Sequence, residues 1–181
     1  MKLAKSLLEV VVIAGIAVFA VILCRQYIFN PYGISGTSMS PNFHDGDYVF
    51  VDQLSYRLRA PQRGEVIVFH GPASGGEDFL KRIIGLPGER VVVKDSAVTI
   101  YNNDNPKGML LDEAYLDPST QTTGDVDMTL GDSQYFVMGD NRSVSFDSRS
   151  WGPLGLDQIV GRVALRIWPP AATRVFGAVQ Y

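Results

Sequence analysis

One serine and one lysine are the residues of this chain best suited to carry out chemistry. Ser38 lies in the turn-forming stretch 36–41, and Lys81 lies in the largely apolar run 79–84. A serine hydroxyl is a poor nucleophile at neutral pH and needs a neighbouring base to take its proton. Neither histidine of the chain belongs to a recognisable catalytic motif, but a lysine in apolar surroundings can serve as the base. The pair therefore predicts a serine hydrolase with a lysine base.

The run around Lys81 predicts a strand that buries the amine. In a strand over 79–84, Phe79, Lys81 and Ile83 share one face, while Arg82 points the other way, toward water. Desolvation between two large apolar neighbours lowers the pKa of a lysine from its usual value near 10.4. A drop of about three units costs roughly 4 kcal/mol and leaves useful neutral amine near neutral pH. Taken alone, the pattern is more typical of an edge-strand lysine whose amine reaches solvent.

A polar segment, residues 138–152, supplies the third group of candidate residues. In this segment Asp147 and Arg149 are candidates for an ion pair that holds the loop in place. Ser145 is a candidate to hydrogen-bond a nearby amine. A structural network of Asx turns is the alternative for this segment, as an ordinary turn is for the stretch around Ser38.

Together the three segments resemble the bacterial type I signal peptidases, which remove signal peptides from exported proteins. The matching blocks are Ser38-Met39-Ser40-Pro41, residues 81–89 and residues 139–149. The resemblance extends from the N-terminal apolar segment to about Trp168. It implies a Ser/Lys dyad and a membrane-bound serine endopeptidase.

The resemblance also implies roles for single residues. Ser38 matches the nucleophile and Lys81 the general base, Ser145 matches the position that orients the lysine amine, and Asp147 and Arg149 match a supporting pair. The substrate is expected as an extended strand beside a sheet edge, with small side chains at two positions before the cut. The pocket walls implied on the same basis are Ile34, Met39, Phe43 and Leu80.

Two positions depart from the pattern of that family. Asn42 stands where threonine is usual, and Gly36 stands where some members carry a serine that helps to stabilise the oxyanion. Here the oxyanion is expected to rely on backbone N–H groups, chiefly that of Ser38. Neither departure removes the dyad, so we expect an active enzyme.

An apolar segment near the N-terminus predicts a membrane anchor. Residues 7–24 carry one charge, Glu9, and are just long enough to cross a bilayer as a helix. Lys2 and Lys5 precede the segment, whereas Arg25 alone follows closely, which favours a cytoplasmic N-terminus and an outer domain. A cleaved signal peptide is the alternative, but the segment ends without a small-x-small site.

Short runs that follow Gly-acid turns predict antiparallel strands after the anchor. The expected strands cover residues 48–51, 66–69, 90–93, 134–138 and 161–168. The fold class is thus mainly β: a single N-terminal transmembrane helix, then an antiparallel β catalytic domain with a small inserted β subdomain. The expected division is 1–6 cytoplasmic, 7–24 transmembrane signal-anchor, 25–93 first catalytic part, 94–133 inserted hairpin or subdomain carrying little chemistry, 134–170 second catalytic part and 171–181 tail.

Composition limits the function classes. The formal net charge is −3 and there is no basic run, so no nucleic-acid partner is expected. No metal or other cofactor is expected, because no ligand set surrounds His44 or His70. The expected partners are signal peptides of exported preproteins and the lipid bilayer. The alternatives are an inactive membrane-tethered β-domain acting as a binding or assembly factor, and a self-cleaving repressor, which the anchor argues against.

Overall fold

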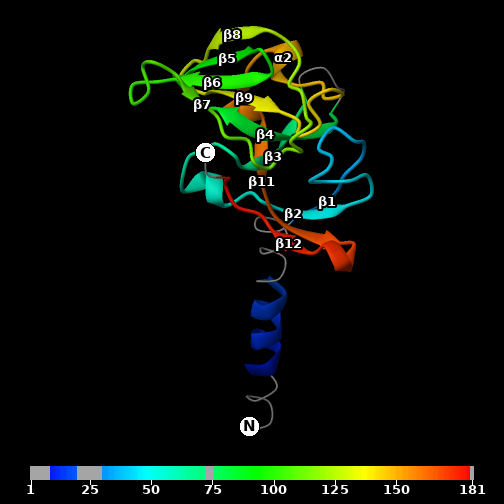
Figure 1. The fold of residues 1–181 in the computed structure, drawn as a ribbon. Helices are drawn as coiled ribbons and strands as arrows, with labels where there is room; N and C mark the ends of the chain where they lie inside the picture. Colours follow the sequence, from blue (N-terminus) through cyan, green and yellow to red (C-terminus); the bar gives the residue numbers. More distant parts are fainter. Residues whose placement is uncertain (1–8, 20–29, 72–75, 180–181) are drawn as a thin grey trace, which may run out of the picture.

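The computed structural model describes residues 9–19, 30–71 and 76–179, and the regular structure from residue 30 onward is mainly antiparallel β strands joined by long loops (Figure 1). The strands are β1 (Asn30–Gly33), β2 (Tyr48–Asp52), β3 (Val66–His70), β4 (Asp78–Gly85), β5 (Arg90–Lys94), β6 (Ala97–Tyr101), β7 (Met109–Leu110), β8 (Val126–Thr129), β9 (Gln134–Met138), β10 (Leu154–Gly155), β11 (Ile159–Trp168) and β12 (Arg174–Val175). The short helices are η1 (Ser55–Arg57), α2 (Ser148–Trp151), η2 (Leu156–Gln158) and η3 (Pro170–Ala172).

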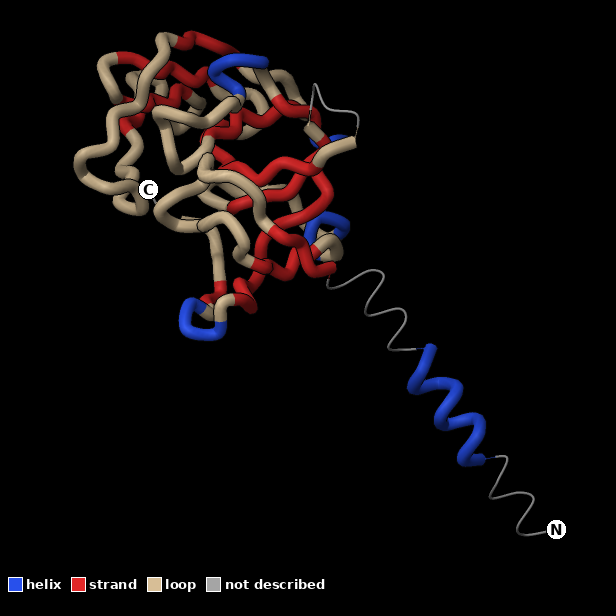
Figure 2. Tube along the Cα trace, turned by 90° about the vertical axis from the view of Figure 1, so that its right-hand side faces the viewer, coloured by secondary structure: helices blue, strands red, loops and turns tan. Residues whose placement is uncertain are grey.

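Within the described residues the strands form two sheets. The larger has eight strands in the order β1-β2-β11-β3-β4-β9-β10, with β12 paired to β11, and the smaller has the order β7-β6-β5-β8. Every pairing is antiparallel. The expected mainly β class and each of the expected strands are therefore confirmed, and Figure 2 shows the strands together in the body of the molecule with long loops between them.

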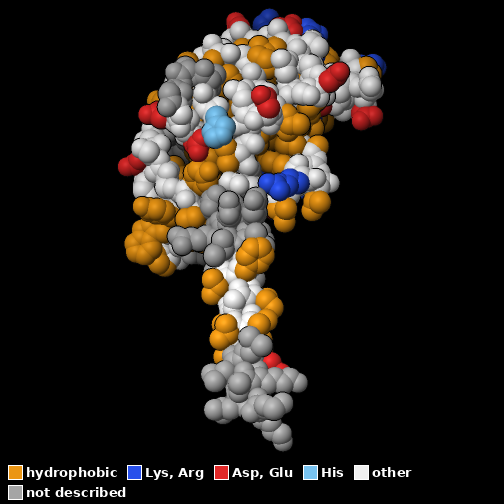
Figure 3. Space-filling model, turned by 180° about the vertical axis from the view of Figure 1, so that it is seen from behind, with side chains coloured by type: hydrophobic (Ala, Val, Ile, Leu, Met, Phe, Trp, Pro, Cys, Tyr) orange, Lys and Arg blue, Asp and Glu red, His pale blue; other side chains and the backbone are white. Residues whose placement is uncertain are grey.

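The predicted anchor is described only in part. Residues 9–19 are helical, and residues 1–8 and 20–29 lie outside the described residues. The described helical part exposes apolar side chains, among them Ile13 and Phe19 (Figure 3). Of the helices in the described ranges, none combines the length and the apolar character needed to cross a membrane.

The larger sheet follows from alternating side chains. In β2, Val49 and Val51 are buried while Tyr48 is exposed, as expected for a strand with one face on a core. β11 is the longest strand and ends before Pro169, which cannot donate a ladder hydrogen bond. Beyond it, the predicted tail contributes β12 to the sheet and places Phe176 against the core.

The smaller sheet begins earlier than the expected insertion. Residues 90–93 were expected in the first catalytic part, but Arg90–Lys94 is β5, the second strand from the edge of the smaller sheet. Its apolar face packs with residues from β4 and β9 in one hydrophobic cluster. The buried members of that cluster are Ile84, Val91, Val93, Val98, Ile100, Leu111, Leu130, Phe136 and Met138. The smaller sheet therefore packs directly against the strand that carries Lys81.

Candidate active site

Ser38 lies in a hydrogen-bonded turn between β1 and β2. The N–H of Ser40 donates to the carbonyl of Thr37 (3.1 Å), and the N–H of Phe43 donates to the carbonyl of Met39 (2.9 Å). Met39 is 2% exposed, so it fixes the turn on the core, while the neighbouring Ser38 stays partly exposed. The turn thus presents the Ser38 hydroxyl from a held backbone.

Lys81 is buried on β4 and its amine reaches Ser38. The Nζ atom donates to Ser38 Oγ (2.9 Å) and to the carbonyl of Leu80 (3.0 Å), and it lies 5.6 Å from the centre of the Phe79 ring. Burial lowers the pKa of Lys81 from 10.5 to about 8, although the charges of Asp147 and Asp140 act in the opposite direction. The structure therefore brings together the two residues that sequence reasoning paired.

Arg82 does not point toward water, so that expectation was wrong. Its side chain is buried and donates two hydrogen bonds to Asp140, from Nε (2.8 Å) and Nη2 (2.6 Å), and one to the carbonyl of Gly64 (2.9 Å). The reason is that β4 is covered on both faces: the loop after β9 brings Asp140 over the face opposite Lys81.

The polar loop after β9 lies directly against the Ser38 turn. The N–H of Asn141 donates to the carbonyl of Ser38 (3.0 Å), and the Asn141 amide donates to that of Thr37 (3.2 Å). A Cβ atom added at Gly139 would collide with the Ser38 carbonyl oxygen and with Ser145 Oγ. Glycine is therefore needed where the two segments approach most closely.

Ser145 is placed beside the dyad but makes no hydrogen bond with the Lys81 amine in the described part of the chain. Its Oγ is buried and makes no well-formed hydrogen bond within the described residues, but it lies close enough to the Asp147 carboxylate to help lower the pKa of that group. The carbonyl of Leu80 instead accepts from the amine, a contact that sequence reasoning missed because a backbone acceptor leaves no residue signature.

Asp147 and Arg149 do pair, at the start of α2. Arg149 donates from Nε to Oδ1 and from Nη2 to Oδ2 of Asp147, both at 2.8 Å, and the N–H of Gly139 donates to Oδ2 (3.0 Å). Burial opposes ionisation, yet the hydrogen bonds and charge of Arg149 hold the pKa of Asp147 below its usual value. This ionised pair fixes the loop that carries Ser145.

A pocket of about 370 Å³ opens beside Ser38 and Lys81. Of the four predicted wall residues, Ile34, Met39 and Leu80 line it. Phe43 does not: it is fully buried beneath the turn, where its ring stacks on Phe176 with ring centres 4.6 Å apart. The remaining lining residues are Tyr32, Gly33, Ser35, Gly36, Thr37, Ser38, Val49, Val68, Asp78, Phe79, Lys81, Val144 and Phe146.

The first half of β4 has an open edge along this pocket. β3 pairs with β4 over residues 78–82, whereas β9 pairs with β4 only from Arg82 to Gly85. Among the described strands, residues 78–81 thus have a ladder partner on one side only. An added strand could pair along this side, where the Leu80 carbonyl is the one backbone group of the four residues already described as accepting from the Lys81 amine.

Comparison with known proteins places these features in a wider context. A model of the family described as "Signal peptidase, peptidase S26" matches residues 7–168. Signal peptidase IB of Staphylococcus aureus (strain Mu50) is 32% identical over 176 residues, covering 91% of each chain. Signal peptidase I of Bacillus caldolyticus is 38% identical over 167 residues, covering 85% of this chain and 87% of that protein. A crystal structure of a signal peptidase I from Enterococcus faecalis is 31% identical and covers 58% of this chain and 97% of its own, with a TM-score of 0.49.

Proposed function

This chain belongs to the signal peptidase family, peptidase S26, and we propose that Ser38 and Lys81 are the dyad with which it removes signal peptides from preproteins. It is a serine endopeptidase, and the inactive binding domain is not favoured. The observation that carries the residue assignment is the 2.9 Å contact between the buried Lys81 amine and the Ser38 hydroxyl.

The proposed reaction starts from neutral Lys81. As Ser38 Oγ attacks the scissile carbonyl, Lys81 Nζ takes the hydroxyl proton, and the resulting ammonium gives that proton to the departing amine. Water then attacks the acyl-enzyme, the same amine takes one proton from it, and Ser38 regains a proton as the acid is released. The backbone N–H of Ser38 is the proposed donor to the oxyanion.

The proposed substrate position is the open edge of β4. A preprotein segment paired with residues 78–81 would lie along the pocket and pass Ser38 at its end. Ile34, Met39 and Leu80 give this pocket a largely apolar wall, which suits small apolar side chains. Asp147 and Arg149 support the loop behind the dyad, and Ser145 is proposed to bond the Lys81 ammonium after Ser38 is acylated.

We also propose a single-pass membrane location, with the N-terminus in the cytoplasm and the catalytic domain on the outer face. The support is the apolar run 7–24, the exposed apolar side chains over residues 9–19, and the lysines that precede the run. A catalytic domain held at the outer face would meet signal peptides where exported preproteins emerge.

The test is mass spectrometry of a preprotein incubated with the full chain in detergent, beside a Ser38→Ala variant. The proposal predicts one cut after a small-x-small site, absent with the variant. A folded wild-type protein that leaves the preprotein intact would point instead to the binding or assembly factor.

A further inference from the structure

The segment 113–123, which we call the strap, connects β7 with β8 and lies in the region expected to carry little chemistry. Its residues contact all three parts of the active site: the Ser38 turn, β4 and the loop after β9. Since these parts are far apart in sequence, a segment that touches each of them can fix their relative positions.

The contact with β4 is made by the Tyr115 ring. The guanidinium carbon of Arg82 lies 4.1 Å from the ring centre, a cation–π contact on the residue next to Lys81. The Arg82 and Asp140 side chains of the ion pair are 4% and 0% exposed. Tyr115 therefore covers a desolvated ion pair, for which loss of surrounding contacts is costly.

The contact with the Ser38 turn is made by Asn42. Its side-chain amide donates to the carbonyl of Tyr115 (2.9 Å) and to Asp140 Oδ2 (2.9 Å). One amide group thus joins the nucleophile turn to the strap and to the loop after β9. The departure from threonine at this position gives the longer side chain that makes both bonds.

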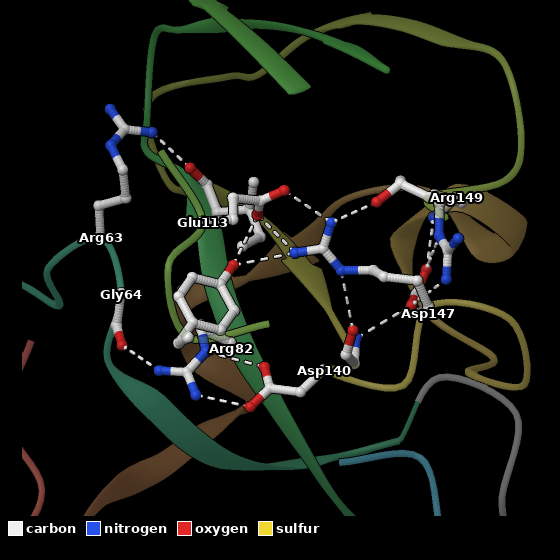
Figure 4. A network of polar contacts seen from close by, with 12 residues as sticks. Arg63, Gly64, Arg82, Glu113, Asp140, Asp147 and Arg149 are labelled. Atoms are coloured by element: carbon white, nitrogen blue, oxygen red, sulfur yellow. Dashed lines mark hydrogen bonds and ion pairs between the residues drawn. The ribbon is translucent and has the colours of Figure 1, made fainter. Parts of the chain in front are cut away.

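The contact with the loop after β9 is made by Arg142, and Arg149 of the adjoining helix α2 adds a further contact. Arg142 is fully buried and donates to Thr122 Oγ1 (2.7 Å), to the Tyr115 hydroxyl (2.9 Å) and to both carboxylate oxygens of Glu113. Arg149 donates to the carbonyl of Thr123 (2.8 Å). Figure 4 shows the Arg82–Asp140 pair, Glu113 of the strap and the Asp147–Arg149 pair within one network of polar contacts.

We propose that the strap positions the dyad and that Tyr115 is its central positioning residue. This inference rests on the proposed function. Tyr115 does not line the pocket and so does not touch the substrate there. Its ring and carbonyl hold Arg82 and Asn42, the neighbours of Lys81 and of the Ser38 turn. Small displacements between nucleophile and base are expensive for catalysis, so loss of Tyr115 should lower kcat and leave KM nearly unchanged.

The experiment compares three variants of the full chain in detergent on one preprotein. Tyr115→Leu removes the ring from Arg82 and the hydroxyl from Arg142, and Tyr115→Phe keeps the ring and removes only the hydroxyl. Tyr101→Leu is the matched control, because Arg90 lies 5.0 Å from that ring in the smaller sheet, away from the active site. Active sites are counted with a serine-directed probe, so that kcat refers to folded enzyme only, and thermal unfolding is recorded for each variant.

We expect kcat for Tyr115→Leu to fall about tenfold per active site with KM within about twofold, substantial recovery in Tyr115→Phe, and wild-type kcat in Tyr101→Leu. Unchanged kcat in Tyr115→Leu, or an equal loss in the control, overturns the inference while the proposed function stands. A wild-type protein that makes no cut overturns both.

A second variant covers the case in which Tyr115→Leu does not fold. Asn42→Ala keeps the Tyr115 ring and removes the amide that joins the Ser38 turn to the Tyr115 carbonyl and to Asp140 Oδ2. The same selective loss of kcat supports the inference, and a wild-type kcat overturns it.

Discussion

At the scale of single residues, the account depends on the protonation of Lys81. Lys81 as a whole is 5% exposed, and its amine lies beside the Phe79 ring and contacts Ser38 Oγ. The atom that burial desolvates is therefore also the atom proposed to act as the base. With a pKa of about 8, roughly a tenth of the amine is neutral at pH 7. Asp140 and Asp147 raise that pKa, so the site balances desolvation against two nearby carboxylates.

The pH dependence of cleavage follows from this balance. Because only the neutral amine can take the Ser38 proton, kcat/KM should rise with pH, level off above about 8, and fall as pH drops below that value. The measurement is initial cleavage rates from pH 6 to 10 at low substrate concentration. A rise in kcat/KM centred at the ordinary lysine pKa, or a kcat/KM that does not change with pH, would contradict the assignment of Lys81 as the base.

The same pKa predicts a stability effect. The folded pKa lies below the unfolded value, so the unfolded state binds more protons between about pH 8 and 10.5, and stability rises over that window. Below about pH 8 the burial of Lys81 lowers the free energy of unfolding by its full amount, which for this pKa shift is about 3 kcal/mol. Lys81→Met should therefore abolish cleavage yet unfold at higher denaturant concentration than wild type at pH 7, with the difference shrinking between about pH 8 and 10.5. A less stable variant at pH 7 would contradict a desolvated lysine.

At the scale of elements, the approach of two loops sets the site. The Ser38 turn and the loop after β9 meet at Gly139, and Asn141 joins them by hydrogen bonds to two carbonyls of the turn. β4 passes behind both and carries Lys81. The chemistry thus depends on the distance between backbones as much as on the side chains.

Gly139→Ala tests that dependence. The added methyl group would collide with the Ser38 carbonyl and Ser145 Oγ, so the loops must separate, at a cost of about 1–3 kcal/mol in stability. We expect kcat to fall by at least about tenfold, since the dyad is displaced. Cleavage rates and thermal unfolding are compared with Gly177→Ala, where nothing lies within 4 Å of the added carbon. Equal activity in the two variants would show that the close approach is not needed.

At the scale of the whole molecule, the sequence predicted local features better than packing between elements. The strands follow from local alternation and turn residues, and the pairing of Ser38 with Lys81 follows from their chemistry. Burial of Arg82 against Asp140, and of Phe43 beneath Phe176, depends on partners far away in the chain. The contacts of Tyr115 depend on how the smaller sheet docks, which no local pattern encodes. Such long-range contacts are the part that required a structure.

The central claim, that buried Lys81 activates Ser38, is tested most directly by the rate of acylation by a serine-directed probe. Intact mass and peptide mapping would follow the adduct in the wild type and in Lys81→Met, with Ser38→Ala as the blank. The account predicts a single adduct on Ser38 in the wild type and a rate at least about a hundredfold lower in folded Lys81→Met. Acylation of Ser38 at the wild-type rate in Lys81→Met, or an adduct on another residue, would contradict it.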